Sequence, residues 1–382
     1  MSDTYPSTPK TIPSLDGIRA VSVLIVAASH AGLGDLIPGG LGVTIFFFLS
    51  GYLITTLLLT ENQRSGGINI PKFYARRVFR LMPPLVISLA IAYGLTYAGL
   101  LDGGITIQGA AAQLLYFANY YGLFFDPGHT VPNGTGILWS LAVEEHFYIV
   151  YPILLATLLR CAFRPRTIGT LLGIGCLVIL AWRAYLVQAA DFDSVRTYYA
   201  SDTRIDSIIY GCILAVVCNP LWQPRRAATI ALGQWAILAV AGVVLLSTLL
   251  IRGIEFRETV RYSLQGLALM PLFYFAVRFP NNILFRPLNL PWMMKLGTYS
   301  YAIYLIHLVV INTIAFNVPA TAGKFIVLFP LAILISVAYA AAIDRFVDRY
   351  FRQLRLKYRP GSATTWPRPA LQPSEAAVLA EH

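Results

Sequence analysis

The feature that most constrains this chain is a series of apolar runs, each long enough to cross a lipid bilayer. A spanning helix needs about 20 mostly apolar residues. The runs recur along almost all of the 382 residues, of which 57% are hydrophobic and 12% charged. We therefore expect an all-α, polytopic integral membrane protein with about ten transmembrane helices, near residues 17–35, 41–60, 81–101, 138–159, 167–189, 204–218, 227–250, 261–279, 296–316 and 323–345.

Two apolar segments need separate interpretation. The run from Ala111 to Phe125 is short, rich in tyrosine and bounded by Gly and Pro, so we expect an interfacial or re-entrant piece. The first run ends in small residues, as a cleaved signal peptide would. Its apolar character continues to Ile37 and it begins with Asp16, which favours a retained span.

The basic residues predict the orientation. With the N-terminus in the cytoplasm, the cytoplasmic segments would hold basic residues in every loop and in the tail. These are Arg64, Lys72, Arg76, Arg77, Arg80, Arg160, Arg164, Arg166, Arg225, Arg226, Arg278, Arg286, Lys295, Arg345, Arg349, Arg352, Arg355, Lys357 and Arg359. The longest opposite loop, about Asp102 to Leu138, has neither Lys nor Arg. By the positive-inside rule, both termini are predicted to be cytoplasmic. The net charge of +11 then reflects topology, and we expect no nucleic-acid partner.

Arg19 and His30 are polar residues in the first span. They are eleven positions apart, which on a helix gives nearly the same face and about 16 Å along the axis. A snorkelling arginine and a hydrogen-bonded histidine would explain each one alone. Together they suggest a channel with an anion site at one end and a base at the other, since polar groups at lipid depth usually mark a site.

Three arginines precede the third span in "FYARRVFRLMPP". Arg76, Arg77 and Arg80 lie within about one helical turn, and Arg77 and Arg80 share a face. Topogenic charge is one explanation. Because guanidinium groups bind phosphate oxygens in pairs, the three are also a candidate phosphate clamp.

A second group of charges lies inside the fourth span, in "LWSLAVEEHFYIVYP". Glu144 and Glu145 point about 100° apart on a helix, so only one can face a given partner. We expect one of them to pair with a histidine or arginine in the bundle, and Arg183 is a candidate. Glu144 is predicted at a depth similar to that of His30.

Two further polar clusters would lie on the acceptor side or support the site. The first, in "SDTRIDSIIYGC", is Asp202, Arg204 and Asp206. The second, in "LGTYSYAIYLIHLVV", is Ser300, Tyr301, Tyr304 and His307, of which Ser300, Tyr304 and His307 share a helix face. A polar contact between helices is the alternative explanation. The four cysteines suggest neither a disulfide framework nor a metal site, and no tightly bound cofactor is expected.

The ordered set of these motifs resembles the membrane-bound acyltransferase type 3 family. It comprises "SLDGIRAVSVLIVAASH", "GVTIFFFLSGYLI", "FYARRVFRLMPP", "WSLAVEEHFYIVYP", "DTRIDSIIYGCIL" and "YSYAIYLIH". The resemblance covers about residues 14 to 345. We therefore divide the chain into a segment at 1–13, an acyltransferase transmembrane domain at 14–350 and a tail at 351–382. The charge-based topology predicts that both ends are cytoplasmic, and the Pro-, Ala- and Ser-rich composition after Pro360 predicts a disordered tail. We expect the bacterial inner membrane as its location.

The resemblance implies transfer of an acyl group, usually acetyl, from cytoplasmic acyl-CoA to a hydroxyl of an extracytoplasmic or lipid-linked glycan. The family's Arg-x10-His motif falls on Arg19 and His30, with His30 as general base or acyl carrier. Its Arg-x-x-Arg motif falls on Arg77 and Arg80, on the acyl-CoA side. The pattern "SLxVEEQFY" matches Ser140 to Tyr148, with His146 where Gln is usual. Independently of the resemblance, a nearby carboxylate, with Glu144 and Glu145 as the candidates, is expected to orient the imidazole and stabilise its protonated form.

Several alternatives stay open. Thr44 replaces the aspartate of the common "GVDxFF" form, which puts an acidic role there in doubt. We expect no Ser-Gly-Asn-His hydrolase-like domain after the last span, so the chain would act alone or with a partner protein. The acceptor can be O-antigen, another exported polysaccharide, a periplasmic glucan, peptidoglycan, a lipid-linked sugar or a macrolide. A proton-coupled transporter is the competing function, although no internal repeat supports it.

Reporter fusions test the predicted orientation. A reporter placed after Arg359 should report the cytoplasm, and one inserted near Gly128 should report the outside, because the basic loops stay inside. Alkaline phosphatase and green fluorescent protein fusions measure the two sides. The reverse result at either position would contradict the charge-based topology.

Overall fold

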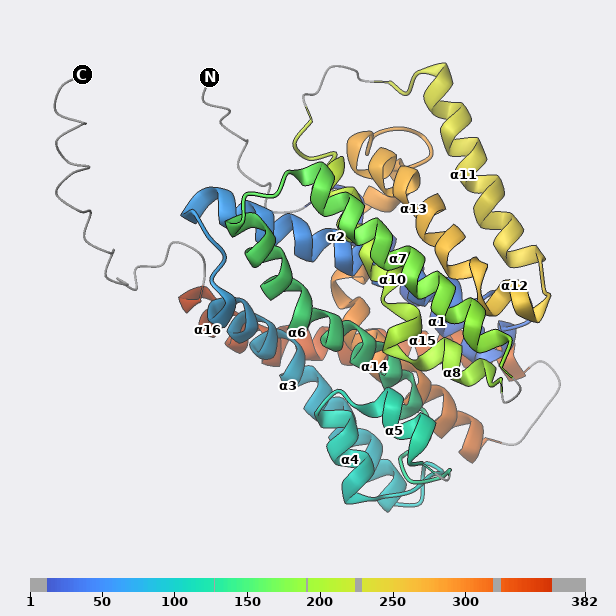
Figure 1. The fold of residues 1–382 in the computed structure, drawn as a ribbon. Coiled ribbons are helices and arrows are strands. Elements are labelled where there is room, and N and C mark those ends of the chain that lie inside the picture. The colour runs from blue at the N-terminus through green and yellow to red at the C-terminus, as the bar shows by residue number, and fades with distance from the viewer. Residues whose placement is uncertain (1–11, 127, 190–191, 224–228, 319–323, 359–382) are drawn as a thin grey trace, which may run out of the picture.

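The computed structural model describes residues 12–126, 128–189, 192–223, 229–318 and 324–358. Regular structure in these ranges is helical (Figure 1). Eight helices are long and apolar enough to cross a membrane. They are Leu15–Leu33, Gly39–Ser65 (α2), Ile70–Tyr97 (α3), Thr135–Arg160, Pro165–Val187 (α7), Leu232–Leu250 (α11), Pro291–Asn317 (α14) and Phe329–Lys357.

Several of these spans join more than one element. The first is α1, Leu15–Ala28, followed by a π-type turn at Ser29–Leu33. The fourth is a 3₁₀ turn, Thr135–Leu138, followed by α6, Trp139–Arg160. The last joins α15, Lys324–Ala342, through the turn Ile343–Asp348 to α16, Arg349–Lys357.

The other two predicted spans are also helices. They are α10, Asp206–Val217, and α13, Val260–Arg278. With 12 residues, α10 is shorter than the ~20 that a full crossing requires. The all-α, polytopic architecture predicted from the apolar runs is confirmed, and the chain is a multi-pass membrane protein.

The predicted interfacial segment is divided into two short helices. These are α4, Ile107–Leu114, and α5, Ala118–Phe124, with a positive φ of 57° at Tyr116 between them. Neither is long enough to span, in agreement with the expectation that Ala111 to Phe125 is not a spanning helix. Three further short helices lie at Ser194–Tyr199 (α8), Ser201–Arg204 (α9) and Ile254–Glu258 (α12).

Two close helix pairs form the centre of the bundle. Helix α2 crosses α10 where a Cβ atom at Gly51 would lie 1.9 Å from the carbonyl oxygen of Ile208. Helix α1 meets α14 where a Cβ at Gly297 would lie 1.7 Å from the carbonyl oxygen of Asp16. Only glycine permits such backbone approach. By contrast, α7 and α11 expose apolar side chains, including Leu177 and Val240, as lipid-facing helices do.

The bundle has two chemically different ends. One end, here called the basic end, brings α16 beside the start of α3, where Arg76 donates a hydrogen bond to the Tyr358 carbonyl at 2.7 Å. At the opposite end the segment 98–138 contacts the end of α14, where Asn312 donates to Asn133 at 2.9 Å. Figure 1 shows α4 and α5 together at this opposite end.

The C-terminal boundary differs from the prediction. The disordered tail was expected from residue 351, but α16 continues to Lys357. Its Phe351 ring lies against Phe79 of α3, with centroids 6.3 Å apart, so aromatic packing holds this helix to the bundle. Residues 1–11 and 359–382, which include most of the predicted terminal segments, lie outside the described residues, as do Arg225 and Arg226.

Candidate active site

Two adjoining cavities lie inside the bundle. The first, here called the basic cavity, has a volume of about 150 Å³ and is lined by Arg19, Arg77, Arg80, Glu144, Glu145, Ser300 and Tyr301, among others. The second, the His30 cavity, has a volume of about 250 Å³ and includes His30, Asn133, Trp139, Tyr198 and Tyr199. Val43 and Tyr304 line both cavities. The cavities therefore meet at these two side chains.

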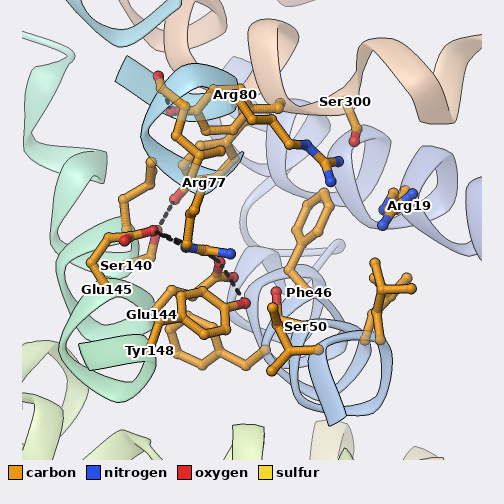
Figure 2. Close-up of a pocket in the computed structure, with 18 of the residues that line it drawn as sticks. Arg19, Phe46, Ser50, Arg77, Arg80, Ser140, Glu144, Glu145, Tyr148 and Ser300 are labelled. Carbon is orange, nitrogen blue, oxygen red and sulfur yellow. Dashed lines mark hydrogen bonds and ion pairs between the residues drawn. The ribbon is translucent and has the colours of Figure 1, made fainter. Parts of the chain in front are cut away.

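The Arg77 side chain is held among acidic and aromatic groups from α6. Its guanidinium contacts the Glu145 carboxylate at 2.7 Å and the Glu144 carboxylate at 4.0 Å. It also lies 3.3 Å from the centroid of the Tyr148 ring, in a cation–π arrangement. Figure 2 shows this group on one side of the basic cavity. An arginine fixed in this way neutralises two carboxylates at lipid depth.

The Arg80 side chain is arranged differently, although it comes from the same helix. It lies within electrostatic range of Arg19, Arg77, Arg355 and Asp348. Figure 2 shows its guanidinium on the side of Ser300 and Arg19, away from the two glutamates. Among the described residues no hydrogen bond or ion pair within 4.0 Å holds it. Arg19 itself is paired with Asp16 at 2.6 Å. Because Asp16 offsets the charge of Arg19, the positive charge on this side of the cavity comes mainly from Arg80.

Arg76 does not belong to this group. Its guanidinium pairs with the buried Glu61 carboxylate at 2.7 Å and donates to the Tyr358 carbonyl. It is absent from the described lining of the basic cavity. Since neighbouring residues on a helix point about 100° apart, Arg76 and Arg77 face different partners. The predicted three-arginine clamp is thus wrong for Arg76.

The partner of His30 is a second histidine. His30 lies in the π-type turn after α1, and its Nδ1 is 3.0 Å from Nε2 of His307 on α14. Glu144, expected near His30, lines the basic cavity instead, so the prediction of a carboxylate beside His30 is wrong. Local π-type turns are frequent at functional sites, and here the turn directs an exposed imidazole into the His30 cavity.

The hydrogen bonds assign the tautomers of this pair. Nδ1 of the fully buried His307 lies 2.7 Å from the Tyr304 carbonyl oxygen. A carbonyl can only accept, so this Nδ1 carries the proton and Nε2 of a neutral His307 is an acceptor. His30 must then donate from Nδ1, which leaves Nε2 of a neutral His30 unprotonated. Nε2 of His30 has no hydrogen-bond partner among the described residues, and His30 lines the cavity, so this nitrogen is a candidate base.

Ser300, Tyr304 and His307, predicted to share one helix face, all lie at or next to the two cavities. Ser300 and Tyr304 line the basic cavity, and His307 contacts His30. The Tyr304 hydroxyl is 2.6 Å from the Ser140 hydroxyl. Tyr301 also lines the basic cavity, and its hydroxyl donates to the Leu81 carbonyl.

Arg183 is not the partner of either glutamate. Its guanidinium pairs with Asp206 at 2.7 Å, and both side chains are fully buried. It also donates to the Thr203 carbonyl and the Ser263 hydroxyl. The predicted pairing is wrong because Arg77, on a neighbouring helix, already meets both glutamates. Arg183 and Asp206 join α7 to α10 as a structural ion pair.

The remaining members of the predicted acceptor-side cluster also lie away from both described cavity linings. Asp202 pairs with Arg196 at 2.5 Å and accepts a hydrogen bond from the Trp182 indole. Arg204 is fully buried, 3.9 Å from the centroid of the Tyr262 ring and 3.3 Å from the Thr44 hydroxyl. Thr44 thus gives Arg204 a hydroxyl contact where the common family form has a carboxylate.

Several lining residues were not predicted. Phe46, Ser50 and Tyr148 line the basic cavity, and Tyr148 ends the motif "SLAVEEHFY", which offered a signal for it. Trp139, Tyr198 and Tyr199 line the His30 cavity. Tyr198 and Tyr199 lie just before the "SDTRIDS" motif, and only their aromatic character could have marked them.

Comparisons with known proteins agree with the motif resemblance. The sequence model of a family described as an acyltransferase domain matches residues 12–345. O-acetyltransferase OatA from three strains of Staphylococcus aureus, NCTC 8325, COL and MRSA252, is 28% identical over 361 residues, which are 92% of this chain. The chain spans 58% of the length of these relatives. No solved structure matches the chain significantly.

The Arg183–Asp206 pair yields a stability prediction. Arg183→Met strands a buried carboxylate, which typically costs about 3–5 kcal/mol, so we expect a clear loss of thermal stability in detergent. The double variant Arg183→Met/Asp206→Leu removes both charges and should recover part of the loss. A double variant as unstable as the single one would contradict the ion-pair assignment.

Proposed function

The chain belongs to the acyltransferase-domain family. We propose that it transfers an acyl group, of which acetyl is the favoured candidate, from cytoplasmic acyl-CoA to a hydroxyl group. The acceptor would be an extracytoplasmic or lipid-linked glycan. The observation that carries this proposal is the meeting of two cavities at Val43 and Tyr304. One cavity offers cations and the other offers an imidazole. A reaction between substrates from opposite sides needs this arrangement.

The basic cavity supports binding of the donor. Coenzyme A carries several phosphate charges on its nucleotide part and a long neutral arm that ends in the thioester. Arg80 supplies positive charge to the cavity, Arg19 lines it while paired with Asp16, and Arg355 of α16 adds to the positive potential around Arg80. Guanidinium groups bind phosphates well. In this proposal the nucleotide stays at the basic end while the arm reaches toward Tyr304.

The His30–His307 pair supports general-base catalysis. The acceptor hydroxyl gives its proton to Nε2 of His30 as its oxygen attacks the thioester carbonyl carbon. The resulting imidazolium is stabilised by Nε2 of His307, which accepts from Nδ1 of His30 at 3.0 Å. The C–S bond then breaks, and the proton passes from His30 to the departing sulfur. The products are an ester and free coenzyme A.

Two alternatives lead to different experiments. In the first, His30 carries the acyl group itself before the acceptor attacks, and an acid quench with donor alone would trap acyl-His30. In the second, the chain is a proton-coupled transporter and leaves the thioester intact. Acceptor-dependent release of free coenzyme A distinguishes an enzyme from a transporter.

The histidine pair gives the main test of this proposal. His30→Ala should abolish acyl transfer with normal expression and membrane insertion, since a positioned base contributes about 10²–10⁴-fold. His307→Ala should lower kcat more than KM, and His307→Gln, which keeps an acceptor, should recover part of the rate. Release of free coenzyme A by purified protein measures these effects. Wild-type turnover by His30→Ala would refute the base assignment.

The arginines of α3 give a second test. Arg80→Ala should weaken acyl-CoA binding by roughly 10–150-fold without loss of thermal stability, because no described carboxylate is stranded. Arg80→Lys should recover only part of the affinity, since an ammonium lacks the guanidinium fork.

Two neighbours on the same helix serve as controls. Unlike Arg80→Ala, Arg77→Ala should lower the thermal stability of the protein, because it leaves Glu144 and Glu145 without their cationic partner. Arg76→Lys should leave acyl-CoA affinity unchanged. Full recovery of affinity by Arg80→Lys would favour a purely topogenic role for Arg80, because the positive-inside rule counts Lys and Arg alike.

A further inference from the structure

The His30 cavity differs sharply in charge from the basic cavity. Among the described residues that line it, none is a lysine, arginine, aspartate or glutamate. Its chemistry comes from an imidazole, an amide, hydroxyls and aromatic rings, chiefly His30, Asn133, Trp139, Tyr198, Tyr199 and Tyr304. A ligand that enters this cavity meets polar groups without a counter-ion.

Three aromatic rings form one wall of the cavity. Trp139 and Tyr199 are stacked, with ring centroids 5.0 Å apart and planes 14° apart. The Tyr198 ring lies 4.9 Å from the Trp139 ring. Among the described residues, neither tyrosine hydroxyl has a hydrogen-bond partner. The wall thus combines aromatic rings with two hydroxyls that the described residues leave without a hydrogen-bond partner.

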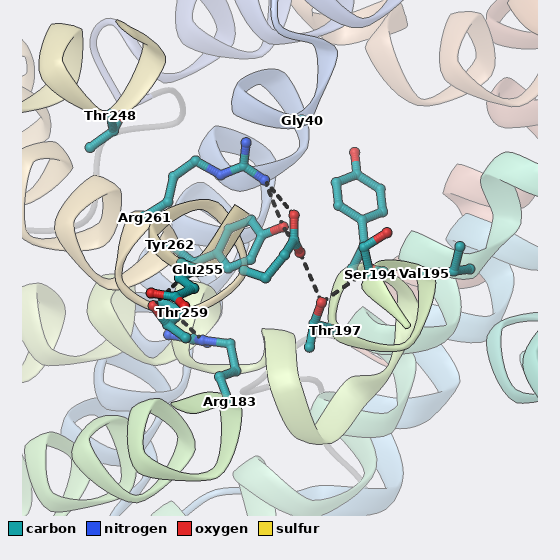
Figure 3. Close-up of polar contacts among 12 residues, drawn as sticks. Gly40, Arg183, Ser194, Val195, Thr197, Thr248, Glu255, Thr259, Arg261 and Tyr262 are labelled. Atoms are coloured by element: carbon teal, nitrogen blue, oxygen red, sulfur yellow. Dashed lines mark hydrogen bonds and ion pairs between the residues drawn. The ribbon is translucent and has the colours of Figure 1, made fainter. Parts of the chain in front are cut away.

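A polar network behind the wall fixes the helix that carries both tyrosines. The Thr197 hydroxyl donates to the buried Glu258 carboxylate at 2.8 Å, and Arg261 lies 3.7 Å from the same carboxylate. Figure 3 shows these contacts between α8 and the neighbouring α12 and α13. Asn119 of α5 additionally donates to the Tyr199 carbonyl. Because α8 is only six residues long, these contacts set the position of its tyrosines.

The arginine that lies beside these rings, Arg204, is shielded from the cavity. The Arg204 guanidinium lies 5.1 Å from the Tyr198 ring centroid and 5.6 Å from the Trp139 ring centroid. Its side chain is fully buried and does not line the His30 cavity. Arg204 can therefore hold the rings by cation–π attraction, but it offers no hydrogen bond to a ligand.

From these contacts we propose that the His30 cavity binds an uncharged pyranose ring, stacked on the Tyr198–Tyr199 wall, with the hydroxyl to be acylated at His30. The C–H groups on one face of a pyranose suit the electron-rich face of an aromatic ring. Its hydroxyls suit the tyrosine hydroxyls and the Asn133 amide. A uronate or phosphorylated sugar would lose the hydration of its charge without gaining a partner, which is costly. This inference rests on the proposed acyl transfer and specifies its acceptor.

Sugar binding to the purified full chain in lipid nanodiscs tests the inference. The probes are methyl glycosides of glucose, galactose and N-acetylglucosamine, the 6-deoxy form of glucose, and the matched glucuronide and galacturonide. Titration calorimetry reports binding whether or not a hydroxyl is acylated. We expect at least one neutral glycoside to bind, and its uronate to bind at least tenfold more weakly. The 6-deoxy control separates the effect of charge from loss of the O6 hydroxyl.

Variants of the wall complete the test. Tyr199→Leu should weaken binding of the neutral glycoside about tenfold, whereas Tyr199→Phe, which keeps the ring, should retain most of the affinity. Tyr97→Leu is the matched control, because Tyr97 is 87% exposed and distant in sequence from the wall. Acyl-CoA binding by the same preparations confirms that the variants are folded.

Three results would overturn the inference: equal binding of uronates, unchanged binding by Tyr199→Leu, or no binding of any pyranoside. Failure of the proposed function has a different signature. In that case the wild-type protein would neither bind acyl-CoA nor cleave its thioester. The sugar titrations would still report whether the His30 cavity binds a pyranoside.

Discussion

The contact between α1 and α14 is the interaction on which the candidate site depends. Backbone approach at Gly297 brings the two helices close enough for Nδ1 of His30 to reach Nε2 of His307. The Tyr304 carbonyl on the same helix then fixes the His307 tautomer. Tyr304 also lines both cavities, so one helix positions the base and the junction where the two substrates would meet.

The cost of charge at lipid depth explains most of the remaining polar contacts. Arg77 neutralises the glutamates of α6, and Arg183 neutralises Asp206. Arg204 instead relies on surrounding aromatic rings and the Thr44 hydroxyl. Arg80, by contrast, has no ion-pair partner within 4.0 Å among the described residues, and its side chain lines the basic cavity. We infer that the arginine proposed to bind the donor, Arg80, is distinct from the arginines that neutralise buried carboxylates, Arg77 and Arg183.

The sequence predicted the helical, polytopic architecture well because the length of an apolar run is a local property. It also indicated which polar residues are unusual, and Arg19, His30, Arg77, Arg80, Glu144 and Tyr304 all line a cavity. Pairing was harder to predict, since it depends on which helices become neighbours. The partner of His30 is 277 residues away, and Arg183 was assigned to the wrong carboxylate for the same reason. The aromatic wall was missed because Tyr198 and Tyr199 carry no charge at lipid depth.

The central claim is that a reaction joins substrates from opposite sides of one membrane. Proteoliposomes containing the purified chain in a single known orientation test it, with labelled acyl-CoA supplied to one face and the glycan acceptor to the other. We predict labelled glycan only when acyl-CoA faces the basic end and the acceptor faces the opposite end. Equal product from both arrangements, or product only when both substrates share one side, would contradict the account.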